Sequence, residues 1–193
     1  MSDPLDPEIL ARILHLATLA PSPFNLQPWR FLVVRDAANR RRLQACAWNH
    51  PQVGQAPVVV IVLGFHEPDR THLDAVLAPQ LELGASTPAR AAEIRGRALA
   101  TLGRVTDRSL WALRSAMLAA SALMRAAESL GVASALIDNF DHEAARTNFG
   151  VPDDHTVCCL IALGHTAEAE PFPGRFGLDE VCYAEHFGQP WTG

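Results

Sequence analysis

Two apolar segments restrict the fold of this chain more than any other feature of its sequence. Residues 57–64 read PVVVIVLG, and residues 157–164 read VCCLIALG. A strand with one wet face alternates apolar and polar side chains, whereas a strand covered on both faces is apolar almost throughout. Both segments are therefore predicted to be buried strands. Other parts of the chain have to cover each face of their sheet.

Helical patterns are available to supply that cover. Asp6 and Pro7 begin the first helix, because Asp caps helices and Pro is favoured in the first turn. Residues 106–130 carry the longest pattern, apolar on most sides and rich in Ala, which predicts a deep core or a subunit interface. A third strand is predicted at 29–35. Further helices are predicted at 36–48, 73–83, 89–102 and 141–149. Strands separated by helices give a layered α/β or α+β domain.

Composition narrows the possible functions. The chain has 193 residues and a formal charge of −5 at pH 7, with no long basic run, so one domain and no binding to nucleic acid are expected. No apolar stretch reaches the roughly 18 residues that a membrane span needs, and no signal peptide is recognisable. Four Cys residues without a C-x-x-C motif fit buried free thiols in a reducing cytoplasm. The adjacent Cys158 and Cys159 would point to opposite sides of a regular strand.

Signatures of hydrolytic and nucleotide-binding sites are absent. The eight His residues form neither an H-E-x-x-H motif nor an i, i+4 pair, so their spacing predicts no metal site. The sequence contains no G-x-S-x-G and no G-x-G-x-x-G, and a P-loop requires the Lys that this chain lacks. Nucleophilic and metal-assisted hydrolysis therefore have no candidate residues.

The segment that remains for chemistry is 20–31, APSPFNLQPWRF. It places three prolines, one hydroxyl group and two side-chain amides between a helix and a strand. Uncharged donors and acceptors on a stiff loop suit a planar heteroaromatic ring that carries hydroxyl groups. The same composition also suits a proline-rich corner whose Ser and Asn side chains only stabilise turns. The residues by themselves leave both interpretations open.

This segment resembles the N-terminal flavin motif of the nitroreductase family, A-P-S-x-x-N-x-Q-P-W-[RH]-F, at every fixed position. Three further segments resemble the family in the expected order. They are Asn49 to Gln52 before the strand at 57, residues 130–141, and residues 161–181 with the closing strand and basic tail. The resemblance covers roughly residues 9–188.

The resemblance implies an α+β fold in which helices flank a mostly antiparallel central sheet, and an intertwined homodimer with FMN between its subunits. It implies a single domain over residues 1–193, in which 65–103 cover the substrate and 165–193 form an extended C-terminal tail. The implied activity passes hydride from NADH or NADPH through flavin N5 to a nitroaromatic, quinone or similar small aromatic acceptor. The cofactor carries this chemistry, so no catalytic side chain is expected.

The resemblance also implies cofactor-binding roles for individual residues. Five of them lie in the loop and would contact the flavin, partly from across the dimer: Pro21, Ser22, Pro23, Asn25 and Gln27. Asn49 would hydrogen-bond the pyrimidine side of the ring, with Gln52 nearby.

The remaining implied contacts lie later in the chain. Leu136 and Ile137 would pack on one face of the flavin, and the backbone N–H groups of Asp138 and Asn139 would face N5. Arg175 would pair with the phosphate, for which a guanidinium fork is well suited.

Three departures from the family pattern bear on cofactor affinity. The sequence contains no Arg-x-Ser-x-Arg segment of the kind that grips the phosphate, although Arg12 or the Arg cluster at 40–42 could replace it. Leu136 stands where the family has Pro. Asn139 stands where it has Gly, and Asn is the least costly substitute if that position needs a positive φ. One charge-assisted contact contributes about 1.5–3 kcal/mol, so the departures predict weakened FMN binding.

Two alternatives stay open at this point. A flavin-binding protein for storage or sensing would bind FMN but oxidise little NAD(P)H. Flavin fragmentation or reductive dehalogenation would use the same fold differently, and no residue in this sequence favours either reaction.

Overall fold

A four-stranded antiparallel sheet forms the centre of the protein, in the order β1-β2-β4-β3. The structure is a computed structural model, and it describes residues 3–165 and 173–191. The strands are β1 (Trp29–Val34), β2 (Val58–Phe65), β3 (Ala133–Ile137) and β4 (His155–Gly164). The two apolar segments are the central strands β2 and β4, and every residue of β2 is buried. The expected α+β class with an antiparallel sheet is confirmed.

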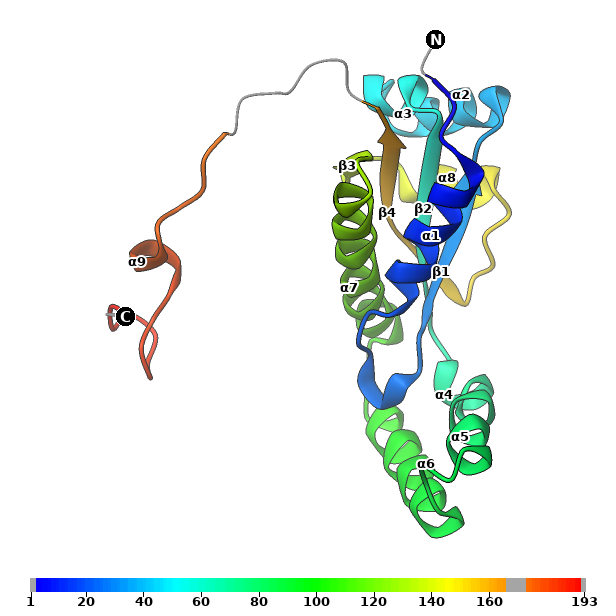
Figure 1. The fold of residues 1–193 in the computed structure, drawn as a ribbon, viewed down its shortest axis with the longest axis vertical. Coiled ribbons are helices and arrows are strands. Elements are labelled where there is room, and N and C mark those ends of the chain that lie inside the picture. Colours follow the sequence, from blue (N-terminus) through cyan, green and yellow to red (C-terminus); the bar gives the residue numbers. More distant parts are fainter. Residues whose placement is uncertain (1–2, 166–172, 192–193) are drawn as a thin grey trace.

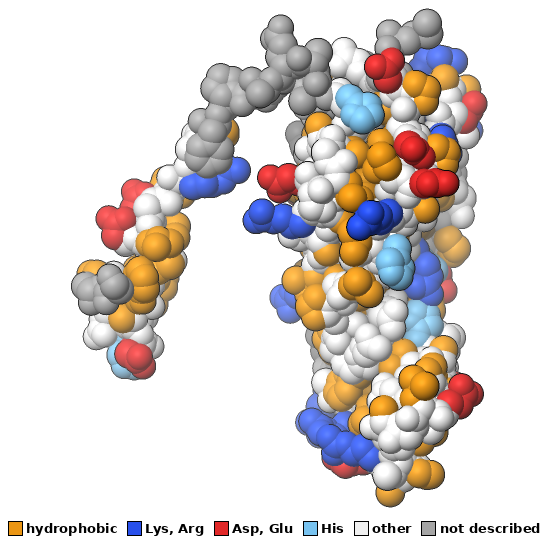
Figure 2. All heavy atoms as spheres, viewed as in Figure 1, with side chains coloured by type: hydrophobic (Ala, Val, Ile, Leu, Met, Phe, Trp, Pro, Cys, Tyr) orange, Lys and Arg blue, Asp and Glu red, His pale blue; other side chains and the backbone are white. Residues whose placement is uncertain are grey.

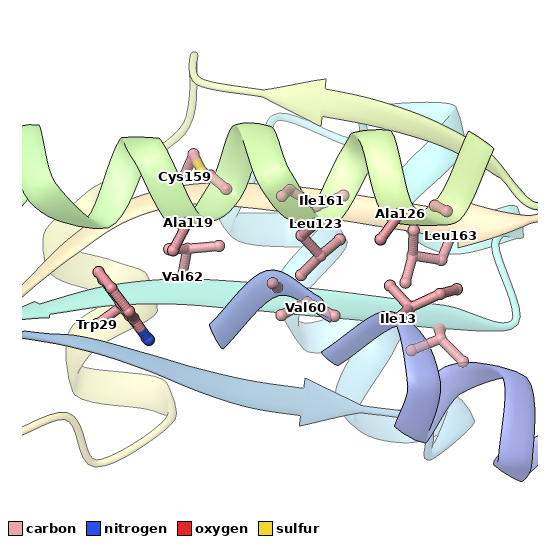
Figure 3. Packing of buried hydrophobic residues seen from close by; sticks show 14 of the residues in the cluster. Ile13, Trp29, Val60, Val62, Ala119, Leu123, Ala126, Cys159, Ile161 and Leu163 are labelled. Carbon is pink, nitrogen blue, oxygen red and sulfur yellow. The ribbon is translucent and has the colours of Figure 1, made fainter. Parts of the chain in front are cut away.

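One face of the sheet is covered by α1 (Pro7–Thr18) and α7 (Arg108–Ser129) (Figure 1). Figure 3 shows Val60 and Leu123 in this layer, together with Ile13 of α1; all three are fully buried. Each helix begins where an Asp accepts a backbone hydrogen bond: Asp6 from Glu8 N–H and Asp107 from Leu110 N–H, each at 2.8 Å. The caps satisfy donors that the first turn of a helix leaves unpaired.

The other face is covered by α2 (Ala37–Cys46), α3 (Pro51–Gln55) and α8 (His142–Asn148). Leu43 of α2 packs there against Ile61, whereas Val60 on the same strand faces the first layer. Neighbouring side chains of a strand point to opposite faces. Because both faces are covered, β2 has to be apolar at every position.

A helical cover, residues 67–105, extends past the end of the sheet after β2 (Figure 1). It contains α4 (Pro68–Thr71), α5 (Leu73–Glu82) and α6 (Pro88–Gly103). Leu73 and Leu102 pack with Leu26 of the proline-rich loop in a small third core. Asp69 of α4 is 5% exposed and forms a bidentate ion pair with Arg108 at 2.8 and 3.1 Å. This pair joins the cover to the start of α7.

The described part of the C-terminal tail, which we call the arm (residues 173–191), lies apart from the sheet (Figure 1). It contains the single-turn helix α9 (Leu178–Val181). Figure 2 shows hydrophobic side chains on its surface, and the large ones that are exposed are Phe176, Leu178, Val181, Tyr183, Phe187 and Trp191. The beginning of the predicted tail, residues 166–172, lies outside the described residues.

Several sequence predictions differ from the structure in detail. The strand β3 was missed, because ASALI is short and three of its five residues are small. The helix predicted at 36–48 ends at Cys46, since Trp48 and Asn49 have positive φ. The sequence analysis also missed the short helices η1 (Pro23–Asn25), α3, α4 and α9. None of the helices in the described ranges combines the length and apolar character that a membrane-spanning helix requires.

The deep core predicted for the Ala-rich helix is confirmed, since most small residues of α7, including Ala116, Ala119 and Ala120, are buried against the sheet of their own chain. One expectation about side-chain directions was wrong. Cys158 and Cys159 both belong to the core on the α7 side. The pairing register shifts between Val62 and Leu63, so β4 has one extra residue there. Such a bulge changes the alternation of side chains along a strand.

The close approach of β2 to α7 yields a test of the packing. A methyl group on Gly64 would lie 2.9 Å from the backbone carbonyl carbon of Ala112. We predict that Gly64→Ala lowers the free energy of unfolding by about 1–3 kcal/mol, the usual cost of overpacking. Gly96→Ala is the control, because nothing lies within 4 Å of that position in α6. It should raise stability by about 0.5–1 kcal/mol. Urea unfolding of both variants measures the difference, and equal stabilities would contradict the packing.

Candidate functional site

The turn after α2 and the segment after β3 meet on one side of the sheet. Asp141 N–H donates to the Cys46 carbonyl oxygen at 2.8 Å, and Asn148 Nδ2 lies 3.2 Å from Cys46 Sγ. The turn that follows Cys46 is closed by Asn49 N–H, which donates to the Gln44 carbonyl oxygen at 2.9 Å. The folded chain thus connects two of the segments to which the resemblance gave flavin contacts.

The turn after α2 has an unusual backbone. Trp48 has φ 45° and Asn49 has φ 61°, in the left-handed region that non-glycine residues rarely adopt. Asn tolerates this region better than other side chains, but Trp does not. The Trp48 side chain is also 60% exposed. Strained backbone of this kind occurs preferentially at functional sites, and only the tertiary structure shows it here.

This side of the protein offers uncharged hydrogen-bonding groups. The side chains of Asn49 and Gln52 are exposed, and neither has a hydrogen-bond partner among the described residues. The backbone N–H groups of Asp138 and Asn139 also lack a partner there. Two side-chain amides and two backbone donors are therefore available to a ligand. The sequence analysis gave a positive φ as a possible reason for Asn at position 139, where the family has Gly. Asn139 does not have a positive φ, so the backbone does not account for the Asn.

The end of β3 presents one apolar side chain to solvent. Leu136 is 43% exposed, whereas Ile137 is buried in the core on the α2 side. Adjacent strand residues point in opposite directions. Leu136 can cover a planar ring with its side chain, whereas Ile137 can approach one only through its backbone.

The proline-rich loop is a second strained segment. Phe24, Asn25 and Gln27 have φ of 53°, 56° and 47°. Ser22 Oγ accepts a hydrogen bond from Gln27 N–H at 2.9 Å, and Gln27 Nε2 donates to the Asn25 carbonyl oxygen at 3.1 Å. The Ser22 hydroxyl therefore stabilises the turn, as expected for a proline-rich corner in which Ser and Asn side chains stabilise turns. The same loop leaves Asn25 exposed, next to exposed Pro21 and Pro23.

The two strained segments lie at opposite ends of β2. The Pro28 carbonyl oxygen accepts from Phe65 N–H at 2.7 Å, which fixes the loop at the end of this strand. Helix α3, which carries Gln52, immediately precedes the beginning of the same strand. Eight residues of extended chain span on the order of 25 Å. One copy of the chain therefore does not bring Asn25 and Asn49 together, and a ligand that touches both needs a second copy.

The candidate phosphate-binding cations have different surroundings. Arg175 lies in the arm, with Nη1 donating to the Gly174 carbonyl oxygen. Arg40 Nη1 donates to the Ala56 and Gly54 carbonyl oxygens, and Arg42 Nη2 donates to the Asn148 carbonyl oxygen at 3.1 Å. These bonds occupy part of the donor capacity that a phosphate would use. Arg12 is exposed on α1.

Sequence reasoning missed a histidine-lined cavity of about 500 Å³ between α7, α8 and β4. His66, His142 and His155 line it, and each forms a 2.7–2.8 Å contact within the chain, to Thr156, the Val157 carbonyl oxygen and Asp154 respectively. Burial, and next the neighbouring His155, lower the pKa of His66. No group of His, Cys, Asp or Glu in the described ranges is arranged to hold a metal ion. The three residues are scattered in sequence, so no spacing motif indicates their proximity.

The buried thiols are unsuited to redox chemistry. Burial raises the pKa of Cys158 to about 12, and burial together with the charge of Cys158 and Asp138 raises that of Cys159 to about 12. The thiolate is the reactive form of Cys. Neither side chain is therefore a candidate electron carrier.

Known proteins resemble this chain in sequence. Residues 1–165 match the sequence model of the Nitroreductase family. A NADH dehydrogenase of Thermus thermophilus is 36% identical over 180 residues, which cover 93% of this chain and 86% of the relative.

Solved structures share the fold. A nitroreductase-like protein of Streptococcus mutans superposes with a TM-score of 0.85 at 23% identity, covering 95% of this chain and 89% of the other. A protein of Exiguobacterium sibiricum that was solved in complex with FMN has a TM-score of 0.83 at 24% identity, with coverage of 95% and 89%. At these identities the two likenesses establish the fold alone.

The raised thiol pKa values predict slow alkylation. At pH 8 about one in ten thousand thiols with a pKa near 12 is ionised, so Cys158 and Cys159 should react far more slowly in the folded protein than after unfolding in urea. Mass spectrometry of iodoacetamide-treated peptides measures the two rates. The Cys158→Ser, Cys159→Ser double variant is the control. In the folded protein, its fastest phase of alkylation by iodoacetamide should be the same as that of the unsubstituted protein. Rapid labelling of either residue in the folded protein would contradict the prediction.

Proposed function

Since the chain belongs to the nitroreductase family, we propose that it carries hydride from NADH or NADPH, by way of FMN, to a small aromatic acceptor such as a nitroaromatic or a quinone. The chain is an NAD(P)H-dependent oxidoreductase with FMN as its cofactor. When bound, FMN supplies hydride acceptance and donation at N5. No side chain has to act as a nucleophile or general base, which agrees with the inert thiols Cys158 and Cys159.

The observation that carries the proposal is the pair of strained, hydrogen-bonding segments at 22–27 and 48–49. Each holds non-glycine residues at positive φ, and each exposes an Asn side chain. With the segment at 136–139, they offer uncharged amides, backbone N–H donors and the exposed Leu136 side chain. These groups fit the polar edge and apolar face of an isoalloxazine ring. The residues present therefore fit FMN.

Individual roles follow from where each group lies. Asn49, with Gln52 nearby, would hydrogen-bond the pyrimidine edge of the ring, where negative charge develops on reduction and positioned donors stabilise it. The N–H groups of Asp138 and Asn139 would face N5. The Leu136 side chain would cover one ring face, with Ile137 contributing only its backbone.

The proline-rich loop would complete the same site from the second copy. Pro21, Ser22, Pro23, Asn25 and Gln27 lie on the order of 25 Å from the turn at 48–49 within one chain, by the length of β2. A two-fold arrangement allows the loop of each copy to reach the ring held by the other. Each of the two equivalent sites would then contain residues of both chains.

Two exposed apolar surfaces support such a homodimer. The outward face of α7 exposes Leu110 and Leu118, at 41% and 48%. The arm exposes six large hydrophobic side chains, with Phe187 at 90% and Phe176 at 78%. Large hydrophobic side chains that are exposed together often mark an interface, and a second copy is the partner we propose. Sedimentation that finds only monomers at micromolar concentration would contradict it.

The remaining assignments concern the phosphate, the acceptor and the compartment. If the arm of one copy packs on the second copy, Arg175 would pair with the FMN phosphate, because a planar guanidinium group can form two parallel hydrogen bonds to a phosphate. The helices of the cover, α4 to α6, fall within the predicted substrate-covering segment 65–103 and would select the acceptor. We place the protein in the cytoplasm, where Cys46, Cys158 and Cys159 would stay as free thiols.

An anaerobic titration tests the proposed activity. FMN added to the purified protein should bind, and NADH or NADPH should then bleach the flavin absorbance, which p-benzoquinone should restore. Free FMN under the same conditions is the control. Binding without bleaching by either nucleotide would defeat the reductase proposal and leave a flavin storage or sensing role.

A single substitution tests the assignment of Asn49. Asn49→Gly removes the side-chain amide but keeps the left-handed backbone, so it should weaken FMN binding about fivefold to tenfold, the effect of losing about one hydrogen bond. The matched control is Gln55→Ala on α3, where the side chain is exposed and outside the proposed site. Flavin fluorescence titration measures both. Equal dissociation constants for the two variants would remove Asn49 from the site.

A further inference from the structure

His72 connects the helical cover to the proline-rich loop. It lies between α4 and α5, and its Nδ1 atom is 2.6 Å from the Leu26 carbonyl oxygen. Its Nε2 atom is 2.7 Å from Nη2 of Arg30, the second residue of β1. The ring also lies near Phe65, with 5.4 Å between ring centroids. One side chain of the cover therefore contacts both the loop and the strand that follows it.

The partners of His72 fix its tautomer. A carbonyl oxygen can only accept a hydrogen bond, so Nδ1 has to carry the proton that Leu26 receives. A guanidinium group can only donate, so Nε2 has to be the acceptor for Arg30. Both contacts form together only in the neutral Nδ1–H imidazole. The other neutral tautomer would place two acceptors together at Leu26 and two donors together at Arg30.

Arg30 extends the connection along the backbone of the loop. Its Nη1 atom donates to the Trp29 carbonyl oxygen at 2.7 Å and more weakly to the Gln27 carbonyl oxygen at 3.4 Å. Its guanidinium carbon lies 5.6 Å from the centroid of the Phe65 ring. Burial lowers the pKa of Arg30 but leaves the group charged. A partly desolvated guanidinium depends on its protein acceptors, and His72 Nε2 is one of them.

Packing reinforces the same attachment. The Leu26 side chain is fully buried, and its small core consists otherwise of cover residues Leu73, Ala98 and Leu102, with Phe24 and Trp111 packed against them. The cover is in turn held to α7 by the buried ion pair of Asp69 and Arg108. The inner side of the loop thus rests on the cover, while its outer side exposes Asn25.

We infer that His72 is a positioning residue which, as the neutral Nδ1–H tautomer, fastens the loop at residues 21–28 to the helical cover and thereby sets how Ser22, Asn25 and Gln27 are presented. This inference rests on the proposed function, because the presented groups are those assigned to the flavin held by the second copy. It follows that the cover influences cofactor binding as well as acceptor choice, through a residue that touches neither ligand.

Three substitutions separate the two contacts of His72. His72→Phe keeps the aromatic contact with Phe65 and loses both hydrogen bonds. His72→Asn places an amide near the position of Nδ1 and keeps a donor for Leu26. His72→Gln reaches toward the position of Nε2 and keeps an acceptor for Arg30. Arg70→Ala is the control, since Arg70 is exposed two residues away and, among the residues that the structure describes, forms an ion pair only with Glu67.

We expect His72→Phe to raise the FMN dissociation constant about tenfold, as the loss of two hydrogen bonds implies. Amide hydrogen exchange of residues 22–27 in the protein without FMN should accelerate by about the same factor. His72→Asn should bring both the FMN dissociation constant and the exchange rate most of the way back to the values of the unsubstituted protein, and His72→Gln should bring them part of the way. Arg70→Ala should change neither quantity. Imidazole ¹⁵N shifts should report the Nδ1–H tautomer for His72.

Two results would overturn the inference. One is an FMN dissociation constant and loop exchange for His72→Phe within twofold of the unsubstituted protein. The other is an Nε2–H tautomer for His72. The exchange and ¹⁵N measurements need no cofactor, so they decide the positioning role even if the unsubstituted protein fails to bind FMN. That last outcome would instead overturn the proposed function.

Discussion

The burial of β2 and β4 on both faces is the constraint on which the rest of the structure depends. Two apolar strands that pair with each other need a helical layer on each side, and α1 with α7 and α2 with α8 provide them. Most backbone groups in these strands pair within the sheet, and beyond the end of β3 the Val157 carbonyl oxygen accepts from His142 Nδ1 instead. The sheet and its two helical layers form a slab, and the strained segments at 22–27 and 48–49, for which we propose ligand contacts, lie at its two ends.

This packing has a direct consequence for the backbone of the two segments. Non-glycine residues at positive φ persist only where the surrounding structure holds them. The turn at 48–49 is held by Gln44 and by the contact of Cys46 with the segment after β3, while Phe24 and Asn25 are held by Ser22, Leu26 and the cover. Each end of the slab therefore presents preformed hydrogen-bonding groups. Preformed groups lose little entropy when a ligand binds, which suits a site assembled from two copies of the chain.

Much of the candidate site could be predicted from the sequence because its residues are contiguous. Local patterns of this kind can be recognised in the sequence alone. They include the order of Pro, Ser, Asn and Gln in the loop and the spacing of Asn49 and Gln52. The roles of Arg30 and His72 could not be predicted, since 42 residues separate them and neither belongs to a recognisable spacing. The direction of Ile137, the bulge beside Cys158 and the inward-facing alanines of α7 likewise depend on contacts with distant strands.

The sequence by itself determined the covered central strands, the capped helices that flank them and the family to which the chain belongs, because apolar periodicity, capping residues and short motifs act over a few residues. The tertiary structure alone decided which ends of the sheet the motif residues occupy, which backbone positions are strained, and which tautomer His72 adopts. These properties depend on how segments far apart in the chain approach one another. No sequence pattern indicates, for example, that the Leu26 carbonyl oxygen lies beside Nδ1 of His72.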